Sequence, residues 1–133
     1  MPTQNRRAFI AGAAALTAAP LLSAKSGDHS VPKLVHHVFF WLKNPDSESD
    51  RNALLAGLKT LGEIPSVRGI HVGVPASTEK REVVDNSFHA SEILYFDDVA
   101  GQDAYQVHPI HKAFVENHSH LWDKVIVYDA VSV

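Results

Sequence analysis

Hydrophobic and polar positions alternate or cluster along the chain in a way that predicts four strands and two helical regions. Four segments are rich in β-branched and aromatic residues between turn residues, as strands are: 33–43, 66–74, 88–96 and 124–133. The segment 49–61 instead spaces its leucines on one face of a helix. Residues 75–87 are polar without a period and indicate an exposed loop.

Pro109 interrupts the second helical region. Proline has no N–H to donate and pushes the residue before it out of the α region. We therefore expect one helix over 97–107 and another over 109–119, with Pro109 at the first helical position, where its fixed φ is favourable. This break places His108 at the junction and His111 in the first turn of the new helix.

The order strand–helix–strand–strand–helix–strand predicts an α+β fold of the ferredoxin-like β-α-β-β-α-β type, with an antiparallel sheet and helices on one face. The first strand is apolar on both faces, with Val38 and Phe40 on one side and Phe39 and Trp41 on the other. The face without helices would be too apolar for water. We therefore predict a homodimer in which a second copy covers that face and completes an α+β barrel.

Residues 1–24 have the layout of a twin-arginine signal peptide, with Arg6-Arg7 ahead of an apolar run and a small-residue end. The alternative is a membrane anchor, but the run is short and Pro20 interrupts it. We expect cleavage at the end of this segment, a flexible lead-in over 25–32 and one domain over 33–133. The mature protein would be periplasmic or secreted, with no membrane attachment.

Charge and cysteine content narrow the possible functions. The chain has 133 residues, with 12 Lys and Arg against 15 Asp and Glu. Signal removal would leave 10 basic residues and a net charge of about −5 with His neutral, which disfavours nucleic acid and anionic membranes as partners. Cysteine is absent, which excludes disulfides, thiol catalysis and Cys-ligated metal clusters.

Several features resemble the stress-responsive dimeric α/β-barrel (Dabb) domain family. They are the element order, the opening strand HHVFF (36–40), the segment YQVHPIH (105–111) and the WDK triplet (122–124) before the last strand. The resemblance covers nearly all of the expected domain, and Tyr-x-x-His-Pro-x-His is its most specific part. It implies a homodimer whose two sheets form a barrel, in a family where most members have no assigned reaction.

The resemblance also implies a site. The plant polyketide (olivetolic acid) cyclase of this fold closes a linear poly-β-keto thioester by an aldol step, using a tyrosine and a histidine. By that resemblance Tyr105 and His111 are the catalytic candidates, and His36 lines the pocket. The cyclase's third-strand histidine has no counterpart in register, because Ala90 stands there and His89 is one place away.

The chemistry of these residue types fits a carbonyl substrate. A neutral imidazole such as His111 can take a proton from the carbon next to a carbonyl, while the Tyr105 hydroxyl positions the oxygen. The predicted ligand-binding residues around them are His36, Val38, Phe40 and His108. In the alternative interpretation the histidines hold the helix junction by hydrogen bonds and the tyrosine only packs.

The predicted function is therefore an exported barrel protein that binds a small apolar or carbonyl ligand and, as an enzyme, would be a cyclase or lyase. One alternative is a non-catalytic ligand-binding or stress-tolerance dimer. Another is a haem or metal-binding dimeric barrel, since related barrels bind haem. The pairs His108/His111 and His118/His120 lack companion ligands, so no metal site and no cofactor is predicted. The roles of His89 and Glu92 stay open.

Overall fold

The computed structural model describes residues 31–133, of which Pro32–Val133 form one compact unit. Its strands are β1 (Leu34–Leu42), β2 (Gly69–Gly73), β3 (Ala90–Phe96) and β4 (Trp122–Val131). Its helices are α2 (Glu48–Thr60), α3 (Val99–Val107) and α4 (Pro109–His118), with short 3₁₀ turns η1 (Leu61–Glu63) and η2 (Ser119–Leu121). The expected signal peptide over 1–24, and nearly all of the lead-in over 25–32, lie outside the described residues.

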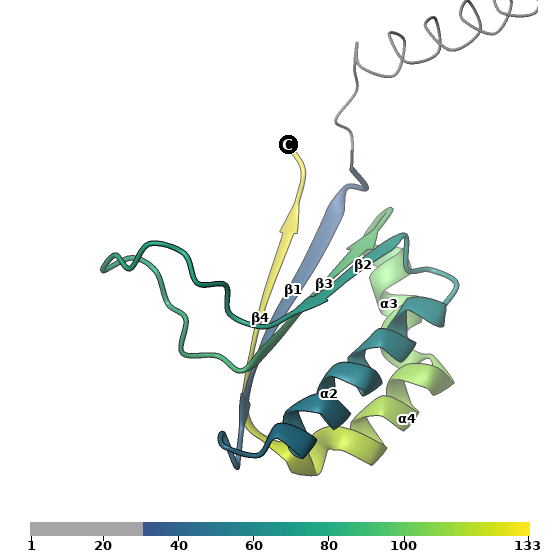
Figure 1. Ribbon diagram of the computed structural model, residues 1–133. Coiled ribbons are helices and arrows are strands. Elements are labelled where there is room, and N and C mark those ends of the chain that lie inside the picture. The colour runs from purple at the N-terminus through teal and green to yellow at the C-terminus, as the bar shows by residue number, and fades with distance from the viewer. Residues whose placement is uncertain (1–30) are drawn as a thin grey trace, which may run out of the picture. The chain divides into compact units, whose positions relative to one another are not determined.

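The four strands form one antiparallel sheet in the order β2-β3-β1-β4, which confirms the ferredoxin-like α+β fold. Figure 1 shows the three helices on one side of the sheet, while the long loop between β2 and β3 extends away from them. None of the helices in the described part is long and apolar enough to cross a membrane. Because β1 lies between β3 and β4 in this strand order, the first strand of the sequence is central in the sheet.

The strand boundaries differ from the expected ones by up to three residues. The second strand is shorter than 66–74, because the chain before Gly69 is still turning and the Val67 N–H donates to the Ile64 carbonyl. The last strand starts earlier than 124, at Trp122, which is paired with Leu42 across a register shift in β1. That irregularity brings the Trp122 ring against Phe40, with centroids 5.0 Å apart.

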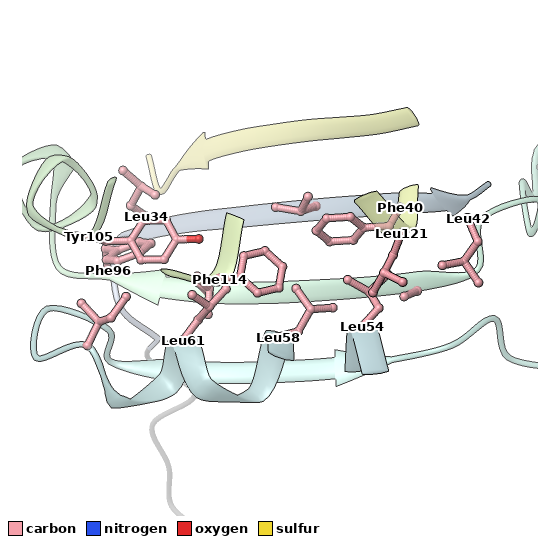
Figure 2. Packing of buried hydrophobic residues seen from close by; sticks show 14 residues of the cluster. Leu34, Phe40, Leu42, Leu54, Leu58, Leu61, Phe96, Tyr105, Phe114 and Leu121 are labelled. Carbon is pink, nitrogen blue, oxygen red and sulfur yellow. The ribbon is translucent and has the colours of Figure 1, made fainter. Parts of the chain in front are cut away.

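Helix α2 packs its leucines on the sheet. The Ser47 hydroxyl caps the helix by accepting from the Asp50 N–H at 3.1 Å, which satisfies one of the free donors of the first turn. Leu54 and Leu58 of α2 and Leu61 of the following turn η1 are fully buried, and Figure 2 shows them pointing toward the strands. The predicted apolar stripe is confirmed.

The break at Pro109 is confirmed as well. His108 ends α3 and begins α4 with an extended backbone (φ −68°, ψ 142°), and Pro109 is the first residue of the new helix. The His108 N–H donates to the Tyr105 carbonyl at 3.1 Å, and its ring Nδ1 accepts from the Ile110 N–H at 3.1 Å. One histidine therefore caps both helices and fixes the angle between them.

The opposite face of the sheet carries half-buried aromatic residues from β1. The rings of His37 and Phe39 pack at a tilt, with centroids 4.2 Å apart. The β2–β3 loop covers part of this face, since Phe88 packs edge-on to Phe39 at 5.0 Å and the Trp41 indole N–H donates to the Ser87 hydroxyl at 3.1 Å. None of the helices within residues 31–133 lies on this side (Figure 1).

Candidate functional site

A cavity of about 330 Å³ lies between the helix-facing side of the sheet and helices α3 and α4. Its polar lining comes from three strands and two helices and includes His36, Glu92, Gln102, Tyr105, His111 and Asp129. Its apolar lining includes Val38, Phe40, Phe114, Trp122, Val125 and Val127. The volume falls in the range typical of small-molecule pockets.

Strand register explains why these groups meet. Side chains two apart on a strand share a face, and directly paired residues of neighbouring strands lie side by side. His36 of β1 is paired with Asp129 of β4, and Val38 is paired with Val127 on one side and Glu92 of β3 on the other. These five side chains therefore all face the helices, and they occupy two neighbouring rows across the sheet.

His36 is held by Asp129. Its Nδ1 lies 2.6 Å from the Asp129 carboxylate, and the His36 side chain is 8% exposed while the Asp129 side chain is about half exposed. The Gln102 amide nitrogen lies 3.3 Å from the same Nδ1 and 3.4 Å from the other Asp129 oxygen. Because the short contact requires Nδ1 to donate to the carboxylate, the amide can donate only to Asp129.

Tyr105 is the buried centre of a ring cluster. It is 2% exposed and makes edge-to-face contacts with His36 at 5.7 Å and with His111 at 4.7 Å. Figure 2 shows its hydroxyl pointing toward the middle of the sheet. Burial, and then the nearby Glu92 and Asp129 carboxyls, raise the pKa of Tyr105. The phenol therefore stays protonated and can act only as a neutral hydrogen-bond group.

His111 lies in the first turn of α4 and is half-buried against Tyr105. Burial lowers the pKa of His111, a backbone hydrogen bond with Gln106 opposes that shift, and the charge of His36 lowers it further. The imidazole is therefore neutral at pH 7, the form in which it can accept a proton.

Glu92 is the member of the site that sequence reasoning left undecided. It is 2% exposed in the middle of β3, and its Oε2 has no hydrogen-bond partner. Burial raises the pKa of Glu92 to about 8. Glu92 shares its strand face with Ala90, Leu94 and Phe96, all fully buried, but Ile93 and Tyr95 make the other face apolar too, so the sequence pattern did not decide which face the carboxyl takes.

The structure brings most of the predicted site residues together. His36, Val38, Phe40, Tyr105 and His111 all line the one cavity. His108 was expected to bind ligand as well but does not line it, because its ring is used to cap α4.

Gln102 and Asp129 are among the lining residues that were not anticipated. Asp129 on β4 holds His36, and Gln102 on α3 donates to Asp129. The alternation of Val125, Val127 and Asp129 along the last strand could have indicated that the carboxylate shares the valine face.

Within residues 31–133, no group of three or more His, Asp or Glu side chains lies close enough together to hold a metal ion.

The fold and cavity define a ferredoxin-like α+β domain with a pocket between sheet and helices. A family model described as "Stress responsive A/B Barrel Domain" matches residues 34–132, and the chain belongs to that family, also called Dabb. No curated protein matches the sequence.

Solved structures share the fold. A Dabb family protein from Mesorhizobium loti is 24% identical, with a TM-score of 0.62 over 77% of this chain and 99% of that one. A hydroxynitrile lyase from Passiflora edulis is 20% identical, with a TM-score of 0.63 over 77% and 96%. A dimeric protein of unknown function from Bacteroides fragilis is 18% identical, with a TM-score of 0.60 over 74% and 95%.

Proposed function

We propose that this protein binds a small apolar or carbonyl-bearing molecule in the cavity between its sheet and helices α3 and α4. The observation that carries the proposal is a cavity of about 330 Å³ that joins an apolar wall to the polar groups of His36, Tyr105 and His111. Pockets of this size and lining are the usual sites for small ligands, because apolar walls supply affinity and a few polar groups supply orientation.

A blocking variant tests the proposal. Val127 lines the cavity from the edge strand β4 and is 45% exposed, so Val127→Trp should fill the opening without disturbing the core. Val107→Trp is the matched control, since Val107 is exposed at the end of α3 and does not line the cavity. Native mass spectrometry of the purified wild type should find a small molecule that Val107→Trp retains and Val127→Trp loses.

Two results would count against the pocket. One is a bound molecule that survives in Val127→Trp. The other is a wild type that carries no molecule and binds none from a fragment library followed by amide NMR shifts. An absorption spectrum and elemental analysis of the same sample test the haem and metal alternatives.

We further propose that the protein works as a homodimer. The face of the sheet away from the helices carries Phe39, Trp41 and Tyr128, and the exposure of Tyr128 reaches 63%. Burying such a face against a second copy removes apolar surface from water, and the Bacteroides fragilis neighbour is described as dimeric. Sedimentation at micromolar concentration should give a dimer, and a stable monomer would refute this.

Export is proposed on the sequence of residues 1–24. The full chain, expressed with its N-terminal segment, should appear outside the cytoplasm, and Arg6→Lys combined with Arg7→Lys should retain it inside. Equal export of both forms would overturn the twin-arginine assignment.

A second candidate function is acid–base catalysis on a carbonyl compound, of the cyclase or lyase type. The ring contact between Tyr105 and His111 at 4.7 Å inside the cavity favours it. Neutral His111 would take a proton from the carbon next to the carbonyl, the electron pair would move to the carbonyl oxygen, and the Tyr105 hydroxyl would hydrogen-bond the enolate. The hydroxynitrile lyase of Passiflora edulis has this fold.

Proton exchange tests the catalytic candidate without a known substrate. In D₂O, the protein should speed deuterium uptake at the carbon next to the carbonyl of phenylacetone, followed by proton NMR. His111→Ala should reduce the rate by roughly 10²-fold or more, and His120→Ala, on an exposed residue, is the control. An exchange rate unchanged by His111→Ala would remove the catalytic candidate and leave ligand binding untouched.

A further inference from the structure

Glu92 occupies an unusual position in the cavity wall. It lies in the middle of β3, directly paired with Val38 of β1 and Val72 of β2, so two aliphatic residues flank it in the sheet. The residue is 2% exposed, lines the cavity, and has an Oε2 atom without a hydrogen-bond partner. A buried polar atom without a partner is costly, so its retention calls for a group that satisfies it.

The titratable groups that share the cavity with Glu92 come from four elements. They are His36 on β1, Asp129 on β4, Tyr105 on α3 and His111 on α4. Asp129 is already paired with His36, and Tyr105 stays protonated. Among the described residues, no Lys or Arg lines the cavity.

This charge pattern decides what the pocket can accept. A carboxylate ligand would meet the Asp129 carboxylate with no Lys or Arg beside it, which is unfavourable in a partly buried site. Burial raises the pKa of Glu92 to about 8, so near neutral pH its carboxyl holds a proton and can donate it in a hydrogen bond. The missing partner is therefore an acceptor.

We propose that Glu92 is the ligand-anchoring residue of this pocket, where its carboxyl donates a hydrogen bond from the cavity wall to an uncharged oxygen acceptor, such as a carbonyl, on the bound molecule. The proposal rests on the ligand pocket proposed above and adds the class of ligand. The pocket selects neutral carbonyl compounds and rejects carboxylates. Glu92 would thus fix where the carbonyl lies relative to Tyr105 and His111.

Tryptophan fluorescence can report ligand binding in this pocket. Trp122 lines the cavity, whereas Trp41 lies on the opposite face, so Trp41→Phe leaves one tryptophan that senses the pocket. Four probes share one ring and differ in their polar group: acetophenone, benzoate, benzylammonium and ethylbenzene. Binding is measured at pH 6.5 by fluorescence and calorimetry in this background and in Glu92→Gln and Glu92→Leu. Glu116→Gln and Glu116→Leu, on the exposed side of α4, are the matched controls.

The background protein should bind acetophenone at least tenfold more tightly than benzoate. Glu92→Gln should keep acetophenone affinity within about threefold, because the amide N–H still donates. Glu92→Leu should weaken acetophenone roughly tenfold, the worth of one hydrogen bond, and should strengthen ethylbenzene. At pH 9 the background protein should lose acetophenone affinity as Glu92 ionises, while Glu92→Gln should not. Both Glu116 variants should match the background protein.

Three results would overturn the proposal, and they separate it from the pocket itself. Equal acetophenone affinity in the background protein and Glu92→Leu refutes the anchor and leaves the pocket intact. Benzylammonium as the tightest probe would show that Glu92 acts as an anion. If none of the probes binds the background protein, both the anchor and the proposed ligand function fall. Glu92→Gln keeps the test valid if Glu92→Leu does not fold.

Discussion

The imidazole of His36 and the carboxylate of Asp129 are direct cross-strand partners, with Nδ1 2.6 Å from Oδ1. A contact this short requires Nδ1 to carry the proton that it donates, and in a neutral imidazole that tautomer leaves Nε2 as the acceptor. Asp129 thus decides which ring nitrogen His36 can offer to a ligand. Gln102 supports the pair from α3 by donating to the second carboxylate oxygen at 3.4 Å.

Asp129→Asn should therefore change the tautomer of His36. In the wild type, nitrogen-15 NMR should show His36 protonated at Nδ1, and in Asp129→Asn it should show a mixture or protonation at Nε2. The fold should persist with a loss of stability below about 1 kcal/mol, because the carboxylate is half exposed. Asp123→Asn, on an exposed residue of the same strand, is the control. An unchanged His36 spectrum in Asp129→Asn would contradict the assignment.

Local signals in the sequence were enough for the fold. Helical spacing of Leu54, Leu58 and Leu61 predicted the buried side of α2, and Pro109 predicted the break between α3 and α4. Both features follow from the local sequence. Proline breaks a helix because it lacks an N–H, and leucines at helical spacing fall on one side of a helix.

The site was predicted only in part, because much of it depends on pairing between distant strands. The contact between His36 and Asp129 spans 93 positions and follows from the β1–β4 register, which the sequence alone did not supply. His108 was misjudged for a related reason. The His108 ring could bind a ligand or cap a helix, and only the geometry of the junction shows that it caps α4.

Gly57 is expected to resist substitution despite its place inside a helix. A Cβ at this position would lie 2.6–2.8 Å from the His118 ring, which is stacked on Phe114 with centroids 5.1 Å apart. Gly57→Ala gains about 1 kcal/mol of helix propensity but must displace that ring, at a cost of roughly 1–3 kcal/mol. We expect a net loss in free energy of unfolding by urea denaturation.

Two comparisons isolate the cause at Gly57. Adding His118→Ala to Gly57→Ala should recover most of the loss, since the obstructing ring is gone. Gly101→Ala in α3, where the nearest atom to a new Cβ lies at 3.5 Å, should be neutral or stabilising. A stabilised Gly57→Ala single variant would contradict the close packing of α2 on α4.

Glu92 should make stability depend on pH. Its pKa is about 8 in the folded protein against an ordinary value of 4.5, so between these values the folded state holds a proton that the unfolded state has lost. Its contribution is fully present below about pH 4.5 and is lost as the pH rises through about 8, at up to about 1.4 kcal/mol per pH unit. Glu92→Gln removes this pH-dependent contribution to stability.

The measurement is the difference in unfolding free energy between Glu92→Gln and the wild type at pH 5, 6.5 and 8. The variant should become more stable relative to the wild type as the pH rises. The contributions of the other titrating groups are common to both proteins and cancel in the difference. Glu116→Gln should give no such trend, because the residue is exposed. A difference that stays constant from pH 5 to 8 would mean that Glu92 is ionised in the folded state.

Association of two copies should weaken at acidic pH because of His37. This residue lies on the face of the sheet away from the helices, and burial, then the charges of His71 and His36, lower its pKa below the ordinary 6.5. Its neutral form is therefore favoured in the folded protein, and that stabilisation, present above pH 6.5, is lost as the pH falls through the lowered pKa. A second copy packed on this face would desolvate His37 further.

Sedimentation should show the dimer dissociation constant rising at least tenfold from pH 7.5 to 5.5 in the wild type and less in His37→Gln, with His120→Gln behaving as wild type. A pH-independent dissociation constant would place the dimer contact elsewhere on the molecule.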